Sequence, residues 1–141
     1  MSVYAESSAV LAWLLGEDPG DAVRGVLGGA DLVLTSDLTL VECDRVLIRA
    51  TALGELPEAE AADRRARLAA AASHWQVLKL GADIVDRARR PFPGEPIRTL
   101  DAIHLASALA ARSVSVGLDL LSLDRRIRSS GQSMGFRVRP E

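Results

Sequence analysis

The chain is poor in cysteine and in aromatic residues, and it has no long hydrophobic run. Cys43 is its single cysteine, so no internal disulfide can form; this is typical of a reducing compartment, and we expect a cytoplasmic protein. Aromatic residues make up only 4% of the sequence, so the core must consist mainly of Leu, Val, Ile and Ala. No apolar run reaches membrane-spanning length and the N-terminus lacks a basic segment, so we expect no membrane association.

An excess of charge of one sign is also lacking, because 17 Lys and Arg face 19 Asp and Glu, for a net charge of −2. This excludes the broad basic field of many nucleic-acid-binding proteins, so any contact with nucleic acid would depend on local arginines or metal ions. Hydrophobic residues amount to 48%, which is ordinary for a globular protein. The length suits one domain with a core and is too short for two, so residues 1–141 are expected to form a single domain.

Short apolar segments alternate with amphipathic ones along the whole chain, which predicts an α/β fold. We expect a central parallel sheet of four to five strands, flanked by helices on both faces in three layers. The strands are expected at 2–5, 31–35, 75–80, 118–123 and 136–139, and the helices at 9–15, 18–29, 38–51, 57–73, 81–90, 99–112 and 124–130.

Local signals suggest how several of these helices begin and end. Ser7 or Ser8 is a natural N-cap for the first helix, Thr99 can cap the sixth, and Gly131 is expected to end the last. In the helix at 38–51, four apolar residues are expected to lie on one face, namely Leu40, Val41, Leu47 and Ile48.

Asp101 lies at the edge of the apolar side of its helix, where an unpaired charge is costly. Glu6 and Asp124 each follow a predicted strand, and Glu42 lies early in the helix after another. The carboxyl ends of parallel strands share one edge of the sheet, where sites form. Two charges about 4 Å apart repel by roughly 4 kcal/mol at an effective dielectric of about 20, so four together require protonation or a divalent cation. Carboxylates favour Mg²⁺ or Mn²⁺, which indicates metal-dependent phosphodiester hydrolysis.

Each acid also has a purely structural interpretation. Asp124 could be an N-cap, and Asp101 and Glu6 could stabilise helix N-termini through the helix dipole. Glu42 could pair with Arg45 on a solvated face, with Asp44 as the rival for the inward position.

Taken in order, the segments around the four acids resemble the motifs of a PIN domain, and more closely those of a VapC-type toxin from a type II toxin–antitoxin pair. The segment around Asp101 (100–108) is the strongest match, and the segment at 39–47 favours Glu42 over Asp44 as the inward-facing acid. The segments are VYAESSAVL (3–11), TLVECDRVL (39–47), LDAIHLASA (100–108) and SLDRRI (122–127).

The resemblance implies a PIN-like fold and an endoribonuclease that hydrolyses RNA with Mg²⁺ or Mn²⁺. It implies metal ligands at Glu6, Asp101 and Asp124, with Glu42 as a further catalytic acid. It also implies a cognate VapB-like antitoxin as partner, an RNA substrate and a homodimer. Alternatives are a degenerate PIN domain that only binds RNA or protein, and a small metal-dependent phosphatase. The second is disfavoured because no Asp-x-Asp pair follows the first strand.

Glu6 departs from the family pattern, which nearly always has Asp at this position. Its extra methylene displaces the carboxylate by up to roughly 1.5 Å, whereas functional geometry tolerates an error of only about 0.5 Å. We therefore expect weaker metal binding, a side chain that coils back, or a contact through water. Replacing Glu6 by Asp should keep or raise ribonuclease activity, while Asp101→Asn should abolish it.

Several other polar residues are candidates for the site. Ser8 and Ser122 could orient the metal ligands, and arginines near the acids could hold RNA phosphates, with a solvated basic face as the alternative. These arginines are Arg98, Arg125, Arg126 and Arg128. His74 and His104 lack metal-ligand spacing and are expected to be structural or exposed, and Asp119 to be a surface acid or to support the site indirectly.

Overall fold

A computed structural model describes all residues from Met1 to Glu141 and contains five strands and seven helices. In chain order these are β1 (Ser2–Ala5), α1 (Ser7–Leu15), α2 (Gly20–Gly29), β2 (Leu32–Ser36), α3 (Asp37–Ala52), α4 (Glu58–Ala72), β3 (Gln76–Leu78), α5 (Ala82–Ala88), α6 (Thr99–Val114), β4 (Asp119–Leu121), α7 (Arg125–Ser133) and β5 (Val138–Arg139).

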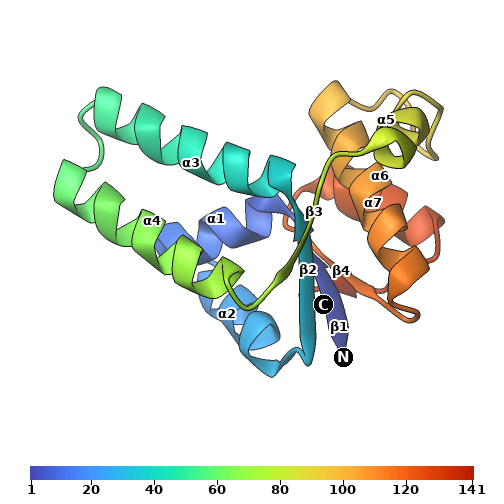
Figure 1. The fold of residues 1–141 in the computed structure, drawn as a ribbon, viewed down its shortest axis with the longest axis horizontal. Coiled ribbons are helices and arrows are strands. Elements are labelled where there is room, and N and C mark those ends of the chain that lie inside the picture. The colour runs from blue at the N-terminus through green and yellow to red at the C-terminus, as the bar shows by residue number, and fades with distance from the viewer.

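The strands form one parallel sheet in the order β3-β2-β1-β4-β5. Figure 1 shows α1 to α4 on one side of this sheet and α5 to α7 on the other, so the predicted three-layer α/β fold is confirmed. β1 lies in the centre, because the chain builds β2 and β3 on one side of it and returns to add β4 and β5 on the other. In such sheets, the point where strand order reverses is where ligands bind.

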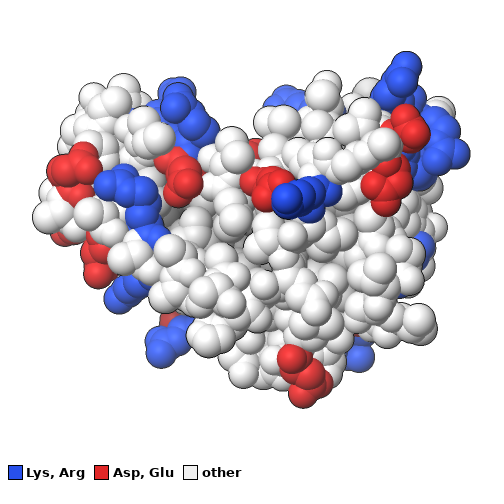
Figure 2. Space-filling model, viewed as in Figure 1, with Lys and Arg blue, Asp and Glu red and all other residues white.

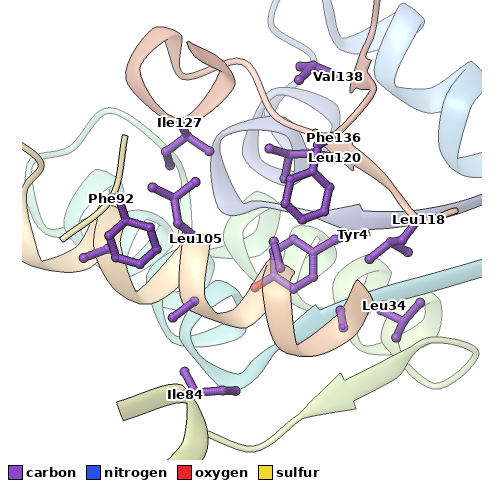
Figure 3. Close-up of a cluster of buried hydrophobic side chains, with 14 residues drawn as sticks. Tyr4, Leu34, Ile84, Phe92, Leu105, Leu118, Leu120, Ile127, Phe136 and Val138 are labelled. Atoms are coloured by element: carbon purple, nitrogen blue, oxygen red, sulfur yellow. The ribbon is translucent and has the colours of Figure 1, made fainter. Parts of the chain in front are cut away.

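Alternation along the strands divides the apolar residues between two cores. Val3 and Ala5 of β1 pack with α1 to α4, whereas Tyr4 between them points into the core beneath α5 to α7. In Figure 3 the Tyr4 ring lies among side chains from the neighbouring strand and from α6, including Leu120 and Leu105. Burial raises the pKa of the Tyr4 phenol to about 12, and its hydroxyl donates to Ser36 Oγ at 3.0 Å.

Two helices are arranged differently from the sequence prediction. α7 runs through Gly131 to Ser133, and a Cβ at Gly131 would lie 2.5 Å from Leu120 Cδ2. This glycine therefore allows close helix–sheet packing and does not end the helix. In α3, Cys43 and Leu47 are buried, whereas Val41 and Ile48 are about half exposed, so the apolar residues predicted to lie on one face are not equally buried.

The predicted helix caps are also wrong at two positions. Glu6, and neither Ser7 nor Ser8, is the N-cap of α1. Thr99 is already inside α6, whose N-cap residue is Arg98, and no side chain caps that end. Cys43 is buried and, as the only cysteine, unpaired, and burial raises the pKa of its thiol to about 12.

None of the seven helices combines the length and the apolar character needed to cross a bilayer.

Candidate active site

The four predicted acids lie near the carboxyl edge of the sheet, at the centre of the strand order. β1 ends at Ala5, and the backbone N–H of the next residue, Glu6, donates to Leu121 O of β4 at 2.9 Å. β4 in turn leads through Ser122 and Leu123 to Asp124. This pairing places the turns that follow β1 and β4 side by side, although Glu6 and Ser122 are 116 positions apart in the sequence.

Three of the acids open onto one cavity of about 790 Å³ between α3, α6 and the start of α7. Glu42, Asp101 and Asp124 line it, together with Arg98, Arg125 and Arg126. Glu6 does not line this cavity.

Glu6 is buried, with 3% of its surface exposed, and hydroxyl groups surround its carboxylate. Oε1 accepts from Ser7 Oγ at 2.8 Å and from the Ser8 backbone N–H at 3.1 Å. Oε2 accepts from Ser122 Oγ at 2.7 Å and from Ser8 Oγ. The longer side chain thus coils back over its own helix terminus. Ser8 and Ser122, which the sequence predicted to orient metal ligands, donate to this carboxylate, and it does not line the cavity.

Glu42, on α3, contacts the Ser7 hydroxyl that also contacts Glu6. Its Oε1 lies 3.0 Å from Ser7 Oγ, whose one proton it shares with Glu6, and it accepts from His104 Nε2. Partial burial alone would raise the pKa of Glu42, but the hydrogen bond and charge of His104, with the Ser7 hydroxyl, outweigh it and lower that pKa. The alternative pairing with Arg45 is therefore wrong, and Asp44 is exposed to solvent.

His104 is the residue that sequence reasoning missed. It is 2% exposed, and its Nε2 lies 3.2 Å from Ser7 Oγ and 3.7 Å from Glu6 Oε1, while its Nδ1 has no hydrogen-bond partner. The signal was its spacing, because His104 follows Asp101 by three residues on the same strip of α6. His74, by contrast, is exposed as expected.

Asp101 has the opposite environment to Glu42. Partial burial raises its pKa, and the nearby charges of Asp124 and Glu6 raise it further, against smaller opposing effects of His104 and Arg98. No hydrogen-bond donor of the protein contacts its carboxylate. A cation placed beside Asp101 would relieve this repulsion.

Asp124 combines its structural and its proposed functional positions. As N-cap of α7 its Oδ1 accepts from the backbone N–H groups of Arg126 at 2.9 Å and Ile127 at 3.1 Å. Its own N–H donates to Ser122 Oγ at 3.1 Å, which fixes the turn. No protein donor contacts Oδ2, so this oxygen is free for a ligand.

The predicted arginines divide into two groups. Arg98, Arg125 and Arg126 line the acidic cavity. The guanidinium of Arg128 instead donates to three backbone carbonyls, those of Ser122 at 2.8 Å, Arg139 at 3.1 Å and Pro140 at 2.8 Å. These hydrogen bonds hold the C-terminal segment next to Ser122. Arg128 as a phosphate ligand is therefore a wrong prediction. Asp119 is likewise not a surface acid, because it is buried against Arg139 at 2.8 Å.

The surface around these helices is hollowed between the α3–α4 hairpin and the α5–α7 side of the molecule (Figure 2). Basic and acidic side chains are mixed over the face shown, and neither sign dominates it. A polyanion would thus meet local arginines and not a broad basic field, as the composition predicted.

The donor set suits a hard cation such as Mg²⁺ or Mn²⁺, since carboxylate oxygens are the available ligands. No three of the acidic, histidine or cysteine side chains converge closely enough to hold an ion together. Mg²⁺ usually keeps several waters and takes only one or two protein carboxylates, which Asp101 and Asp124 can supply. Glu6 does not fit this role, because protein donors already surround its oxygens.

Comparison with known proteins places this arrangement in a family. A family model described as "PIN domain" matches residues 3–131. Ribonuclease VapC46 of Mycobacterium tuberculosis is 32% identical over 140 residues, covering 97% of this chain and 95% of the relative. Ribonuclease VapC49 of the same species is 30% identical over 138 residues, covering 98% and 94%.

Solved structures share the fold at lower identity. VapC20 of Mycobacterium tuberculosis, described as a sarcin-ricin loop cleaving toxin, superimposes with a TM-score of 0.68 at 17% identity, over 98% of this chain and 99% of that chain. A toxin–antitoxin complex from Klebsiella pneumoniae gives 0.64 at 16% identity, over 94% and 92%. By its motifs, its fold and its sequence relatives, the chain belongs to the PIN-domain family, among the VapC-type proteins.

Proposed function

We propose that the protein is a metal-dependent endoribonuclease toxin that hydrolyses RNA phosphodiester bonds. The observation that carries the proposal is the single cavity lined by three carboxylates and three arginines, in a chain whose relatives are named ribonucleases. Carboxylates can hold a cation, and arginines can hold the phosphates on either side of the scissile bond.

Asp101 and Asp124 are the residues that would hold Mg²⁺ or Mn²⁺, because both open onto the cavity and both have oxygens without protein donors. When bound, the ion supplies an activated water and neutralises charge that develops on the phosphate. Glu42 keeps its charge because its pKa is lowered, and its free Oε2 can accept a hydrogen bond from a water at the cavity wall.

Arg98, Arg125 and Arg126 are the proposed phosphate ligands. These residues line the cavity beside the acids, so a phosphodiester chain that crosses it meets cations and carboxylates together. Such contacts position the substrate without reading its sequence.

A VapB-like antitoxin is the proposed partner. Two solved structures with this fold are described as a toxin–antitoxin complex and as VapBC2 of Rickettsia felis bound to DNA, with TM-scores of 0.64 and 0.65. A second cavity, of about 630 Å³, runs along α3 over Val41 and Ile48, and it shares Glu42 and Leu100 with the acidic cavity. A partner segment seated on this apolar surface would also reach the site. We further propose a homodimer, which light scattering of the purified chain would test.

The test of the function is cleavage of a long single-stranded RNA by the purified chain in Mn²⁺, Mg²⁺ or EDTA. We expect internal cuts with either metal, none in EDTA, and recovery when Mn²⁺ is added back. Asp101→Asn protein purified in parallel controls for contaminating nuclease. Absence of both Mn²⁺ binding and cleavage, in wild type and in Glu6→Asp, would overturn the proposal and leave a domain that only binds RNA or protein.

A further inference from the structure

We infer that Glu6 is a positioning residue in this chain and that the metal ion is held without it. The inference rests on the proposed metal-dependent function, and it reverses the role that the family pattern gives to the first acid. Glu6 instead builds the buried wall behind Glu42.

The hydrogen-bond capacity of Glu6 is the first argument. An ionised carboxylate offers about four acceptor positions on its two oxygens. Four donors contact Glu6, two at each oxygen, and they come from Ser7, Ser8 (hydroxyl and backbone N–H) and Ser122. An ion that took one of these positions would have to displace a protein donor from a side chain that is 3% exposed.

The direction in which each acid faces is the second argument. Glu42, Asp101 and Asp124 line the cavity, whereas Glu6 does not. Asp124 Oδ2 and the Asp101 carboxylate have no protein donor, so these oxygens can bind an ion without breaking a hydrogen bond. An ion is therefore bound more favourably on the α6–α7 side of the cavity than beside Glu6.

The Ser7 hydroxyl joins Glu6 to Glu42, which gives Glu6 its positioning role. Ser7 Oγ lies 2.8 Å from Glu6 Oε1 and 3.0 Å from Glu42 Oε1, yet it has one proton to donate. Glu42 therefore depends on a second donor, and His104 Nε2 is the group that contacts it. Glu6, by competing for the Ser7 proton, sets how Glu42 is held, and His104 secures it from α6.

This network leaves Glu42 with one oxygen fixed and the other free at the cavity. Both Oε1 contacts come from buried side chains, Ser7 and His104, so the carboxylate has little freedom to turn. Removing the charge of Glu6, or the donor at His104, should therefore alter the chemical step while leaving the ion and the RNA bound.

The experiment compares Mn²⁺ binding, by calorimetry, with steady-state RNA cleavage in wild type, Glu6→Gln and Asp101→Asn. We expect Glu6→Gln to change the Mn²⁺ Kd by less than about threefold, equivalent to only a small change in binding free energy. We expect it to lower kcat by about tenfold with little change in KM, as for loss of a group that matters only in the transition state. Asp101→Asn should lose Mn²⁺ binding, and Glu17→Gln, an exposed glutamate, serves as the matched control.

A second pair of variants approaches the same wall from α6 and does not require Glu6→Gln to fold. His104→Leu should lower kcat with the Mn²⁺ Kd unchanged, and His104→Gln, which keeps an N–H donor for Glu42, should restore most of the rate. His74→Gln is the control on an exposed histidine. Circular dichroism spectra and Tm values establish that each variant is folded.

Loss of Mn²⁺ binding in Glu6→Gln to the same extent as in Asp101→Asn would overturn the inference, because Glu6 would then be a ligand. An unchanged kcat in both Glu6→Gln and His104→Leu would overturn the positioning role. Both results presuppose a wild type that binds Mn²⁺ and cleaves RNA. A wild type that does neither contradicts the proposed function itself, so the two failures are distinguishable.

Discussion

The two walls of the acidic cavity hold carboxylates in opposite ways. On the α1–α3 side, Glu42 lines the cavity and Glu6 is enclosed behind it. Both carboxylates contact buried hydroxyl groups, and Glu42 also accepts from His104. On the α6–α7 side, Asp101 has no protein donor and Asp124 has one oxygen occupied and one free. A satisfied carboxylate is fixed in place, whereas an unsatisfied one is available to a ligand.

The pKa values of the acids on the two sides of the cavity are shifted in opposite directions. The pKa of Glu42 is lowered because hydrogen bonding to His104 and Ser7 outweighs its burial. The pKa of Asp101 is raised by burial and by the charges of Asp124 and Glu6. Glu42 is thus stabilised in its charged form by the protein itself, whereas the charged form of Asp101 would be stabilised by a bound cation.

The largest effect on activity is expected at Asp101, on the side of the cavity where the carboxylate has no protein donor. Asp101→Asn is expected to lower the rate of RNA cleavage by about a hundredfold or more, because it removes a proposed ligand of the metal ion whose charge would stabilise the transition state. Initial rates in saturating Mn²⁺ measure this. Asp86→Asn, on the exposed side of α5, is the matched control. Wild-type rates in Asp101→Asn would remove Asp101 from the site.

The hydrogen bonds around Glu6 are expected to contribute to the stability of the fold. Ser122→Ala removes the donor to Glu6 Oε2 and the acceptor for the Asp124 N–H, so buried polar groups lose partners. We expect the free energy of unfolding in urea to fall by about 1–3 kcal/mol. Ser133→Ala, at the exposed end of α7, should change it by less than about 0.5 kcal/mol. Equal stabilities of the two variants would contradict the picture of a tightly hydrogen-bonded wall.

The arginines around the cavity allow the same contrast. Arg98→Ala and Arg126→Ala should each raise the Kd for RNA several-fold and reduce the slope of log K against log salt by about one, as expected for a lost phosphate contact. Arg128→Ala should leave that slope unchanged and lower the Tm, because Arg128 holds backbone carbonyls. Binding in EDTA over a salt series provides the measurement, and equal slopes for Arg98→Ala and wild type would exclude a phosphate contact at Arg98.

The smallest effect concerns pH. An acid whose pKa is raised on folding binds its proton more tightly in the folded state, so stability falls as pH rises from the unfolded pKa of 3.8 through the raised folded value. Asp101→Asn removes this loss and should raise the Tm by about 1–2 °C at pH 7 without metal, since a partly exposed charge is screened. The gain should shrink as pH falls below the unfolded value. A Tm decrease at pH 7 would contradict the proposed repulsion.

Elements made by local sequence were largely predictable. The short apolar strands at 2–5 and 31–35, and the helices between glycine and proline signals, lie within a few residues of their predicted ends. Their alternation was sufficient for a parallel three-layer sheet, because consecutive parallel strands require crossover helices. The position of Asp124 shortly after a strand suggested an N-cap as one of two roles, and Asp124 is the N-cap of α7.

What the sequence by itself determined is the order of the elements and the presence of acids at strand–helix turns, since both follow from spacing along the chain. Only the tertiary structure decided which acids open onto the cavity and which are enclosed. Ser122 reaches Glu6 across 116 positions and His104 reaches Glu42 across 62, so these hydrogen bonds exist only once β1 pairs with β4 and α6 packs beside α3. Burial and hydrogen-bond partners depend on such distant neighbours, and they separate the fixed carboxylate of Glu6 from the available one of Asp101.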